Sequence, residues 1–562
     1  MSVRGNPAAA SAAAGDEGEE TAEELLTRVA GMVPAAVNAA TAAAGFPGRW
    51  KAIAAKLRTL PARLSDLSSH PCFARNALCR ELLQSVAATL ADAAELAARA
   101  PGAAGKLQTQ SAIDALGARL DVNIRDCTLL VRTGVLSDAA STPPPAAAKA
   151  DVRELLARLQ IGHGEAKGRA VDGLLDALAK DEKSVLSALS RANVAALVQL
   201  LTAPAPAVRE KAATVVCQLA ESGGGVCEAL LVSEGAVAPL LRLAESGSSL
   251  AAREKAVLTL HRLSARPDAA LAIAGHGGAR ALVEICQTGD SVSQAAAAGA
   301  LKNLSAVPEA LHALADEGIV RVMVGLLDHG TVLGSKEHAA DCLENLTSAS
   351  DAFRLAVASD GGLRSLLLHL DAPSPRESAV RALGNIVCAV APDTLVSLGA
   401  LPRLAHVLRV GSPGAQQAAA SAVCKISGSG ERDMKRLIGE HGCVPPLVRM
   451  LDAKSAGARE AAAQALASLA AHPANARETR RDERSVPSLV QLLDPSPANT
   501  AKKYAIACLL ALSSAKRCKK QMISHGAIGY LKKLTDMEVA GAGDLLDRLE
   551  DRGRLRSIFS KS

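Results

Sequence analysis

An asparagine recurs at nearly regular intervals in the segments ALKNLS, CLENLT and ALGNIV. The three residues, Asn303, Asn345 and Asn385, are 42 and 40 residues apart, and each directly precedes a Leu or an Ile. An amide side chain carries a hydrogen-bond donor and an acceptor together, so it can pair with a peptide group whatever side chains lie beside that group. An asparagine near a helix end can also cap the helix or bond a neighbouring loop. Both uses depend on the element that carries the asparagines.

A helical repeat of about 42 residues accounts for this spacing. If the position of each asparagine is called the anchor, steps of this length give the anchors Gln218, Arg262, Asn303, Asn345, Asn385, Lys425, Ser468 and Ala511. An alanine lies six residues before every anchor, and aliphatic residues lie two before and one after it. Steps of four and three residues define one face of an α-helix. We therefore predict that this face forms the core and that the alanine marks the closest approach of a neighbouring helix.

A second helix is predicted before each anchor helix, and in seven units it follows a turn glycine. These glycines are Gly235, Gly277, Gly318, Gly361, Gly399, Gly442 and Gly526. A glycine in the left-handed conformation ends the helix before it. Each unit is therefore predicted to contain a short helix, a turn, a medium helix, a loop and a longer anchor helix.

Composition favours an all-α chain of this kind. Apolar residues make up 49% of the 562 residues but aromatic residues only 1%, which suits helices packed closely through Ala and Leu. A chain of this length exceeds one hydrophobic core, so a repeat array is expected. The twelve cysteines have no spacing suited to zinc, and no apolar run is long enough to span a bilayer. We expect reduced thiols and a cytoplasmic location, with the nucleus also open.

The unit, with G-a-(V/I/L)-x-x-L before the anchor helix and E-x-A-x-x-A-L-x-N-L-S within it, resembles the armadillo repeat. The resemblance implies a right-handed α-solenoid, or superhelix. We expect it over residues 151–562, in about nine units with atypical terminal caps. In armadillo proteins the third helices line a concave groove, and an asparagine at the anchor hydrogen-bonds the backbone of an extended peptide.

The resemblance therefore assigns a partner-binding groove to the anchor row and to the row one turn earlier. The predicted groove residues are Asn303, Asn345, Asn385, Arg262, Arg381, Lys425, Asp341 and Gln218. The three cations among them outnumber Asp341, a mildly basic lining that favours a peptide with some acidic character. Importin-α places tryptophans in the earlier row, and none is present here, so we do not expect binding of nuclear-import signals.

The first 150 residues do not follow the repeat. We expect a disordered N-terminus over 1–20, a bundle of about four helices over 21–140, and a stiff Pro/Ala linker, STPPPAAAKA, over 141–150. The bundle, with FPGRWKAIAAKLRTL, is similar to the N-terminal domain of plant U-box proteins, yet no U-box stands between it and the repeats. The chain thus resembles plant armadillo proteins that keep this domain and lack the U-box, and ubiquitin-ligase activity is not carried over.

These patterns predict a non-enzymatic scaffold or adaptor that binds an extended partner segment in the groove and a second protein on the N-terminal bundle. We find no nucleophile and base pair and no G-K-[ST] phosphate loop, so no cofactor, metal or small-molecule substrate is expected. The alternative is a substrate-presenting component of a ubiquitin-ligase pathway without U-box activity of its own.

The basic run KRCKK, residues 516–520, leaves three interpretations open. It is a solvated helix end, a nuclear signal or nucleic-acid patch, or a surface for peripheral membrane contact. Nucleic acid is not an expected partner, because aromatic residues that stack on bases are nearly absent nearby.

Overall fold

The computed structural model describes residues 20–99, 106–133, 135–136, 144–161, 164–247, 249–428 and 432–559. This part of the chain is all-α, as predicted: a helical bundle is followed by an α-solenoid of helix triplets. The chain divides into two compact units, residues 1–259 and 260–562. The segment expected to be disordered, residues 1–20, lies outside the described residues except for Glu20.

The first unit begins with a bundle made of α1 (Ala22–Ala42), α2 (Pro47–Leu57), α3 (Leu60–Ser68), α4 (Ala77–Ala98) and α5 (Lys106–Arg132). A capping box starts α1: Thr21 Oγ1 accepts the Glu24 backbone N–H, and the Glu24 carboxylate accepts that of Thr21. Successive turns of α1 then place Leu25, Val29 and Val33 on one face, where they are buried in the bundle core.

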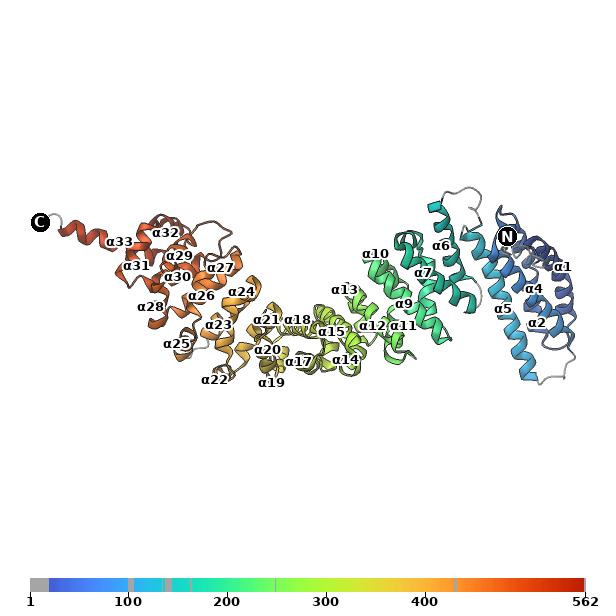
Figure 1. The fold of residues 1–562 in the computed structure, drawn as a ribbon, viewed down its shortest axis with the longest axis horizontal. Coiled ribbons are helices and arrows are strands. Elements are labelled where there is room, and N and C mark those ends of the chain that lie inside the picture. Colours follow the sequence, from blue (N-terminus) through green and yellow to red (C-terminus); the bar gives the residue numbers. More distant parts are fainter. Residues whose placement is uncertain are drawn as a thin grey trace, which may run out of the picture. The chain divides into compact units, whose positions relative to one another are not determined.

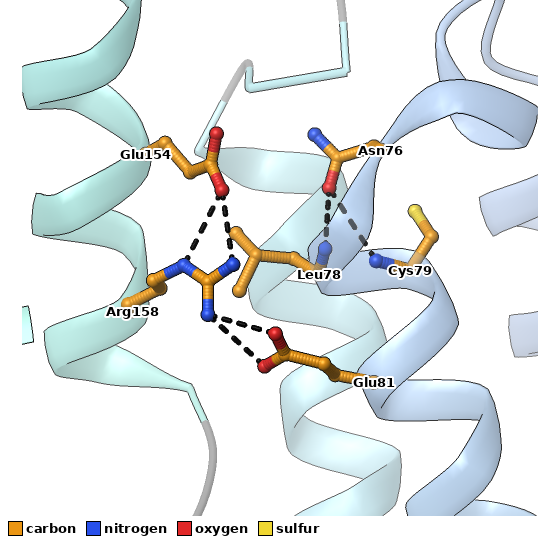
Figure 2. A network of polar contacts seen from close by, with 6 residues as sticks. All are labelled: Asn76, Leu78, Cys79, Glu81, Glu154 and Arg158. Atoms are coloured by element: carbon orange, nitrogen blue, oxygen red, sulfur yellow. Dashed lines mark hydrogen bonds and ion pairs between the residues drawn. The ribbon is translucent and has the colours of Figure 1, made fainter. Parts of the chain in front are cut away.

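The predicted linker over 141–150 is wrong, because a helix begins inside it. The first turn of α6 (Pro144–Gln160) tolerates its two prolines, and the alanines that follow are the strongest helix formers. This helix packs onto the bundle: Ala157 is buried in the bundle core, and the Arg158 guanidinium pairs with Glu81 of α4 at 2.9 Å (Figure 2). A helix that packs on the bundle therefore occupies residues 144–150 of the predicted linker, and residues 141–143 lie outside the described residues.

The first unit continues through α7 (Gly164–Ala188), α8 (Arg191–Leu200), α9 (Pro206–Ser222), α10 (Gly224–Ser233) and α11 (Val237–Ser246). The first of these helices is interrupted at Asp181, which has φ −149° and ψ 78°. The next helix, α12 (Leu250–Ser264), contains the residues at which the first unit ends and the second begins.

The second unit repeats a triplet of helices in chain order (Figure 1). The triplets are α13 (Pro267–Gly275), α14 (Gly278–Thr288) and α15 (Ser291–Ser305); α16 (Leu311–Asp316), α17 (Ile319–His329) and α18 (Leu333–Ala349); α19 (Asp351–Ser359), α20 (Gly362–His369) and α21 (Glu377–Ile386); α22 (Pro392–Ser397), α23 (Ala400–Val410) and α24 (Pro413–Ser427); α25 (Arg432–Glu440), α26 (Val444–Met450) and α27 (Ala456–Leu469); α28 (Pro473–Arg481), α29 (Ser485–Gln491) and α30 (Lys502–Leu512); α31 (Lys516–Ser524), α32 (Ala527–Asp536) and α33 (Ala542–Phe559). Each third helix packs on the third helix of the next triplet.

The predicted face of the anchor helices forms the core. The alanine six residues before the anchor is 0% exposed in all eight units: Ala212, Ala256, Ala297, Ala339, Ala379, Ala419, Ala462 and Ala505. The aliphatic residues two before and one after the anchor are also buried, except Leu510 of α30, which is half-buried. The triplet after α30 is the last of the array, and a terminal repeat leaves one side in water.

The turn glycines have the predicted left-handed backbone. At Gly277, before α14, φ is 77°, in the region that a Cβ atom disfavours. The seven φ angles lie between 66° and 83° at Gly235, Gly277, Gly318, Gly361, Gly399, Gly442 and Gly526.

Two further findings concern the state of the cysteines and the length of the apolar helices. The cysteines are free thiols, and most are buried, whereas Cys388 is exposed. Among the described residues, no single helix is both long and apolar enough to cross a bilayer. The helices α13 and α14 meet the length and composition test only as a pair, with an 88° bend between them.

Candidate partner-binding surface

The three asparagines lie on the consecutive third helices α15, α18 and α21, and each donates hydrogen bonds to the end of the third helix before it. The Nδ2 atom of Asn345 is 3.0 Å from Ser305 Oγ and 3.2 Å from the carbonyl oxygen of Lys302. The equivalent bonds join Asn303 to Ser264 at 2.9 Å, and Asn385 to Ser348 at 3.0 Å and to Thr347 at 3.2 Å. The amides therefore tie successive repeats together.

The acceptor half of each amide is still open. The side chains of Asn303, Asn345 and Asn385 are half-buried, and no residue of the described chain donates to their Oδ1 atoms. An amide nitrogen has two protons, and all three asparagines use both inside the chain, since Asn303 also donates to the His261 carbonyl oxygen at 3.5 Å. The predicted two-sided pairing with a peptide group is therefore unavailable to these residues. What remains is a row of acceptors for N–H donors.

The charged candidates on α18 and α21 are engaged in ion pairs. Asp341 accepts two hydrogen bonds of 3.2 Å from Arg376, which also pairs with Glu337 at 2.9 Å. Burial raises the pKa of Asp341, but the hydrogen bonds and the charge of Arg376 outweigh it and hold the pKa below its ordinary value. Asp341 is thus an ionised carboxylate at neutral pH.

Arg381 is paired in the same way, with Glu344 at 3.4 Å and with Glu377 one turn before it on α21. Burial raises the pKa of Glu344, and the charge of Arg381 opposes that rise. Two arginines on these helices therefore face four carboxylates, those of Glu337, Asp341, Glu344 and Glu377. The expected mildly basic lining is wrong at α18 and α21, because the partners of the candidate residues carry the larger charge.

A histidine pair lies beside these carboxylates, and the sequence reasoning missed it. Gly299, one turn before Asn303, leaves room for His261, since a Cβ there would come within 2.4 Å of the ring Nε2. The rings of His261 and His338 meet edge to face, with centroids 5.4 Å apart. Burial, helped by the charge of His338, lowers the pKa of His261 to about 4. In the sequence, the signal for this pair was Gly299 itself, because the other residues of the row one turn before the anchors have side chains.

A cavity of about 650 Å³ opens where α21 ends at Ile386 and gives way to the short 3-10 helix η3 (Val387–Ala389). It brings together Lys425 of the anchor row with Ser421 and Gln464 of the row one turn earlier. Its apolar lining comes from Val387, Val390, Pro392, Leu395 and Ile426, and its thiols from Cys388 and Cys424. The Lys425 Nζ atom donates to the Gly384 carbonyl oxygen at 2.8 Å, which holds the ammonium at this site.

The two remaining predicted residues lie on earlier third helices. Arg262 is exposed on α12. Gln218 lies on α9, in the first compact unit, and its buried Oε1 atom has no hydrogen-bond partner among the described residues. The structure therefore groups the three asparagines, Asp341, Arg381 and Lys425 on neighbouring third helices. We call the exposed surface of α15, α18, α21, α24 and α27 that carries these residues and the cavity the third-helix surface.

Comparison with family models identifies two parts of the chain. Residues 432–471, which contain the triplet α25 to α27, match the armadillo/β-catenin-like repeat. Residues 27–135, which include most of the bundle, match DUF7032, a domain of unknown function. The armadillo resemblance is confirmed for this repeat, whereas a plant origin and a relation to U-box proteins stay predictions.

Among solved structures, the chain is similar to an engineered protein whose crystal structure was determined by the Northeast Structural Genomics Consortium. The two are 28% identical with a TM-score of 0.62, and the match covers 71% of this chain and 99% of the engineered one. No curated protein is similar enough to match this chain. The comparison supports the all-α solenoid and leaves the partner to be inferred from the surface.

Proposed function

We propose that this chain is a non-enzymatic scaffold whose third-helix surface binds an extended segment of a partner protein. The observation that carries the proposal is the row formed by Asn303, Asn345 and Asn385. Each amide is held in place by its donor half, and its acceptor half is open. Packed helices are about 10 Å apart, close to three residues of a segment in the polyproline II conformation, whose period of three residues points every third backbone N–H toward the row of acceptors.

Hydrogen bonds alone are too weak for a useful complex. Three of them contribute about 3 kcal/mol, whereas a micromolar complex needs about 8 kcal/mol. The cavity beside Lys425 supplies a further contribution, because burying one Leu or Phe side chain there is worth about 1.5–3 kcal/mol. The segment therefore carries an apolar side chain for the cavity, an acidic group for Lys425, and a basic group for the carboxylates of α18 and α21.

The test is a library of random linear peptides displayed on phage and selected on the full chain. Substitution Gln464→Trp fills the cavity without touching the bonds between repeats, so the selected peptides should bind this variant at least tenfold more weakly. The matched control Lys454→Trp introduces the same ring at an exposed position outside the cavity and should bind like the wild type. Peptides that bind all three proteins equally, or a library without enrichment, would contradict the proposal.

The predicted second partner on the N-terminal bundle and the ubiquitin-ligase alternative stay predictions. The bundle is continuous in its packing with α6, so a partner would meet a surface made by both. A ligase role predicts ubiquitin transfer only when a separate ligase is supplied with the chain, which a reconstituted reaction would measure.

A further inference from the structure

Positive charge is concentrated in one stretch of the second unit. Residues 473–536 contain 12 Lys or Arg against 5 Asp or Glu, a net charge of +7, while the whole chain has +6. The densest part is α31, with Lys516, Arg517, Lys519 and Lys520 and no acidic residue. This helix is the first of its triplet, so it is not part of the third-helix surface. Figure 1 shows it beside α32 near the C-terminus.

The position of these cations within α31 does not serve the stability of the helix. All four lie in the N-terminal half, where the helix dipole is positive and repels them. Arg517 forms an exposed pair with Glu483 at 2.8 Å, and Lys519 donates to the Arg548 carbonyl oxygen at 3.0 Å. Lys516 and Lys520 have no ion pair with any residue that the structure describes. Lys516 and Lys520 therefore remain available to an external anion, and Lys519 keeps its positive charge uncompensated by a carboxylate of the described residues.

An exposed apolar side chain lies on the same face. Ile523 is 40% exposed, and it follows Lys516, Lys519 and Lys520 at helical spacing. Cys518 and Met522 point the other way and are buried. We call the set Lys516, Lys519, Lys520 and Ile523 the α31 face, in which Lys519 is half-buried and the other three side chains are exposed.

We propose that the α31 face binds an anionic phospholipid surface. Lysines around an apolar side chain suit the boundary between headgroups and acyl chains: the ammonium groups meet lipid phosphates while the isoleucine enters the boundary. Nucleic acid fits less well, since the only aromatic residues in 473–536 are Tyr504 and Tyr530, and Lys503 covers the ring of Tyr504 at 4.7 Å. The face stands apart from the partner-binding surface, so this inference does not depend on the proposed function.

The experiment is flotation of the purified full chain with vesicles of phosphatidylcholine, with and without phosphatidylserine. We expect flotation only with phosphatidylserine, and less of it as salt rises, because counterions screen exposed charges. The variant Lys516→Ala/Lys519→Ala/Lys520→Ala should partition roughly 100-fold more weakly. The control Lys180→Ala/Lys183→Ala/Lys454→Ala removes the same charge from exposed positions elsewhere and should partition like the wild type.

A second variant separates lipid from other polyanions. Ile523→Ser should weaken vesicle binding several-fold while leaving retention on a duplex DNA column unchanged, because only the bilayer takes up the apolar side chain. Circular dichroism and thermal melting check that each variant folds. The proposal is overturned if the wild type does not float at low salt, or if the control variant loses as much binding as the α31 variant. Binding to DNA through these lysines without binding to vesicles would overturn it as well.

Discussion

At the scale of single residues, the asparagines join successive repeats through their donor atoms, and the proposed partner binding uses their acceptor atoms. Asn345 donates to Ser305 and Lys302 of the preceding repeat, and its Oδ1 atom is left for a partner. Rows of buried alanine and leucine could be predicted because helical periodicity is local. The partners of the amides could not, because the bonded residues are 37 to 43 positions apart and no pattern within either segment indicates the pairing.

The bond between Asn345 and Ser305 is predicted to contribute to stability. A double-mutant cycle of Asn345→Ala and Ser305→Ala should give a coupling free energy of roughly 0.5–1.5 kcal/mol in urea unfolding. The cycle removes the contributions that each side chain makes elsewhere, including the bond of Ser305 to the Lys302 carbonyl oxygen. Additive effects of the two substitutions would show that the repeats are not joined through this amide.

His261 is predicted to make stability depend on pH. Its pKa is about 4 in the folded chain against an ordinary value of 6.5, so the unfolded chain binds more protons between these values. The free energy of unfolding therefore falls as pH decreases from 6.5 toward 4, by roughly 1–3 kcal/mol for this group. The variant His261→Gln should lose less stability across this window than the wild type. Identical pH profiles of the two proteins would contradict the burial of a neutral imidazole.

At the scale of helices, the closest packing is set by the alanine row. Ala505 of α30 is 0% exposed, so Ala505→Leu has no space and should lower the free energy of unfolding by roughly 1–3 kcal/mol. Ala507 of the same helix is exposed, and Ala507→Leu should change it by less than about 0.5 kcal/mol. Urea unfolding of both variants measures the difference, and equal effects would mean that the row does not mark the helix contact.

The packing of α6 on the bundle gives a second prediction at this scale. The Arg158 guanidinium bridges Glu154 of its own helix and Glu81 of α4 (Figure 2). Burial opposes the charged form of Arg158, but these carboxylates outweigh it and raise its pKa. Arg158→Ala should speed hydrogen exchange in α6, because one of the bonds that hold it to α4 is lost.

The control for this exchange experiment is Arg99→Ala. Arg99 pairs with Glu95 within α4 at 2.8 Å, and both side chains are exposed, so the pair contributes little. The variant should leave exchange in α6 unchanged. If Arg158→Ala also leaves it unchanged, the ion pair does not hold α6 on the bundle.

The two errors of the sequence analysis also arise at this scale. The proline-rich run over 141–150 was expected to be a stiff linker, although the first turn of a helix tolerates proline and three alanines follow. The mildly basic lining was expected because the charges were counted only in the anchor row and in the row one turn earlier. Their partners Glu344 and Arg376 lie outside those rows, and packing between helices brings them there.

At the scale of the molecule, the second unit presents two surfaces with different chemistry. The third-helix surface has open amide acceptors and a cavity, whereas the α31 face has three lysine ammonium groups around an isoleucine. If both proposals hold, the chain would bring a partner segment to an acidic membrane. The repeat itself was predictable from the sequence, but the cavity was not, because it depends on where α21 ends and on three residues brought together by the fold.

The most direct test of the central claim is site-specific photo-crosslinking. A photo-reactive amino acid is placed at position 421, at the cavity, or at the exposed position 454, outside it, and each full chain is irradiated with a peptide selected on the wild type. The account predicts a crosslinked product from position 421 and none from position 454. Crosslinking from position 454 alone, or from neither position while the peptide still binds, would contradict a partner segment on the third-helix surface.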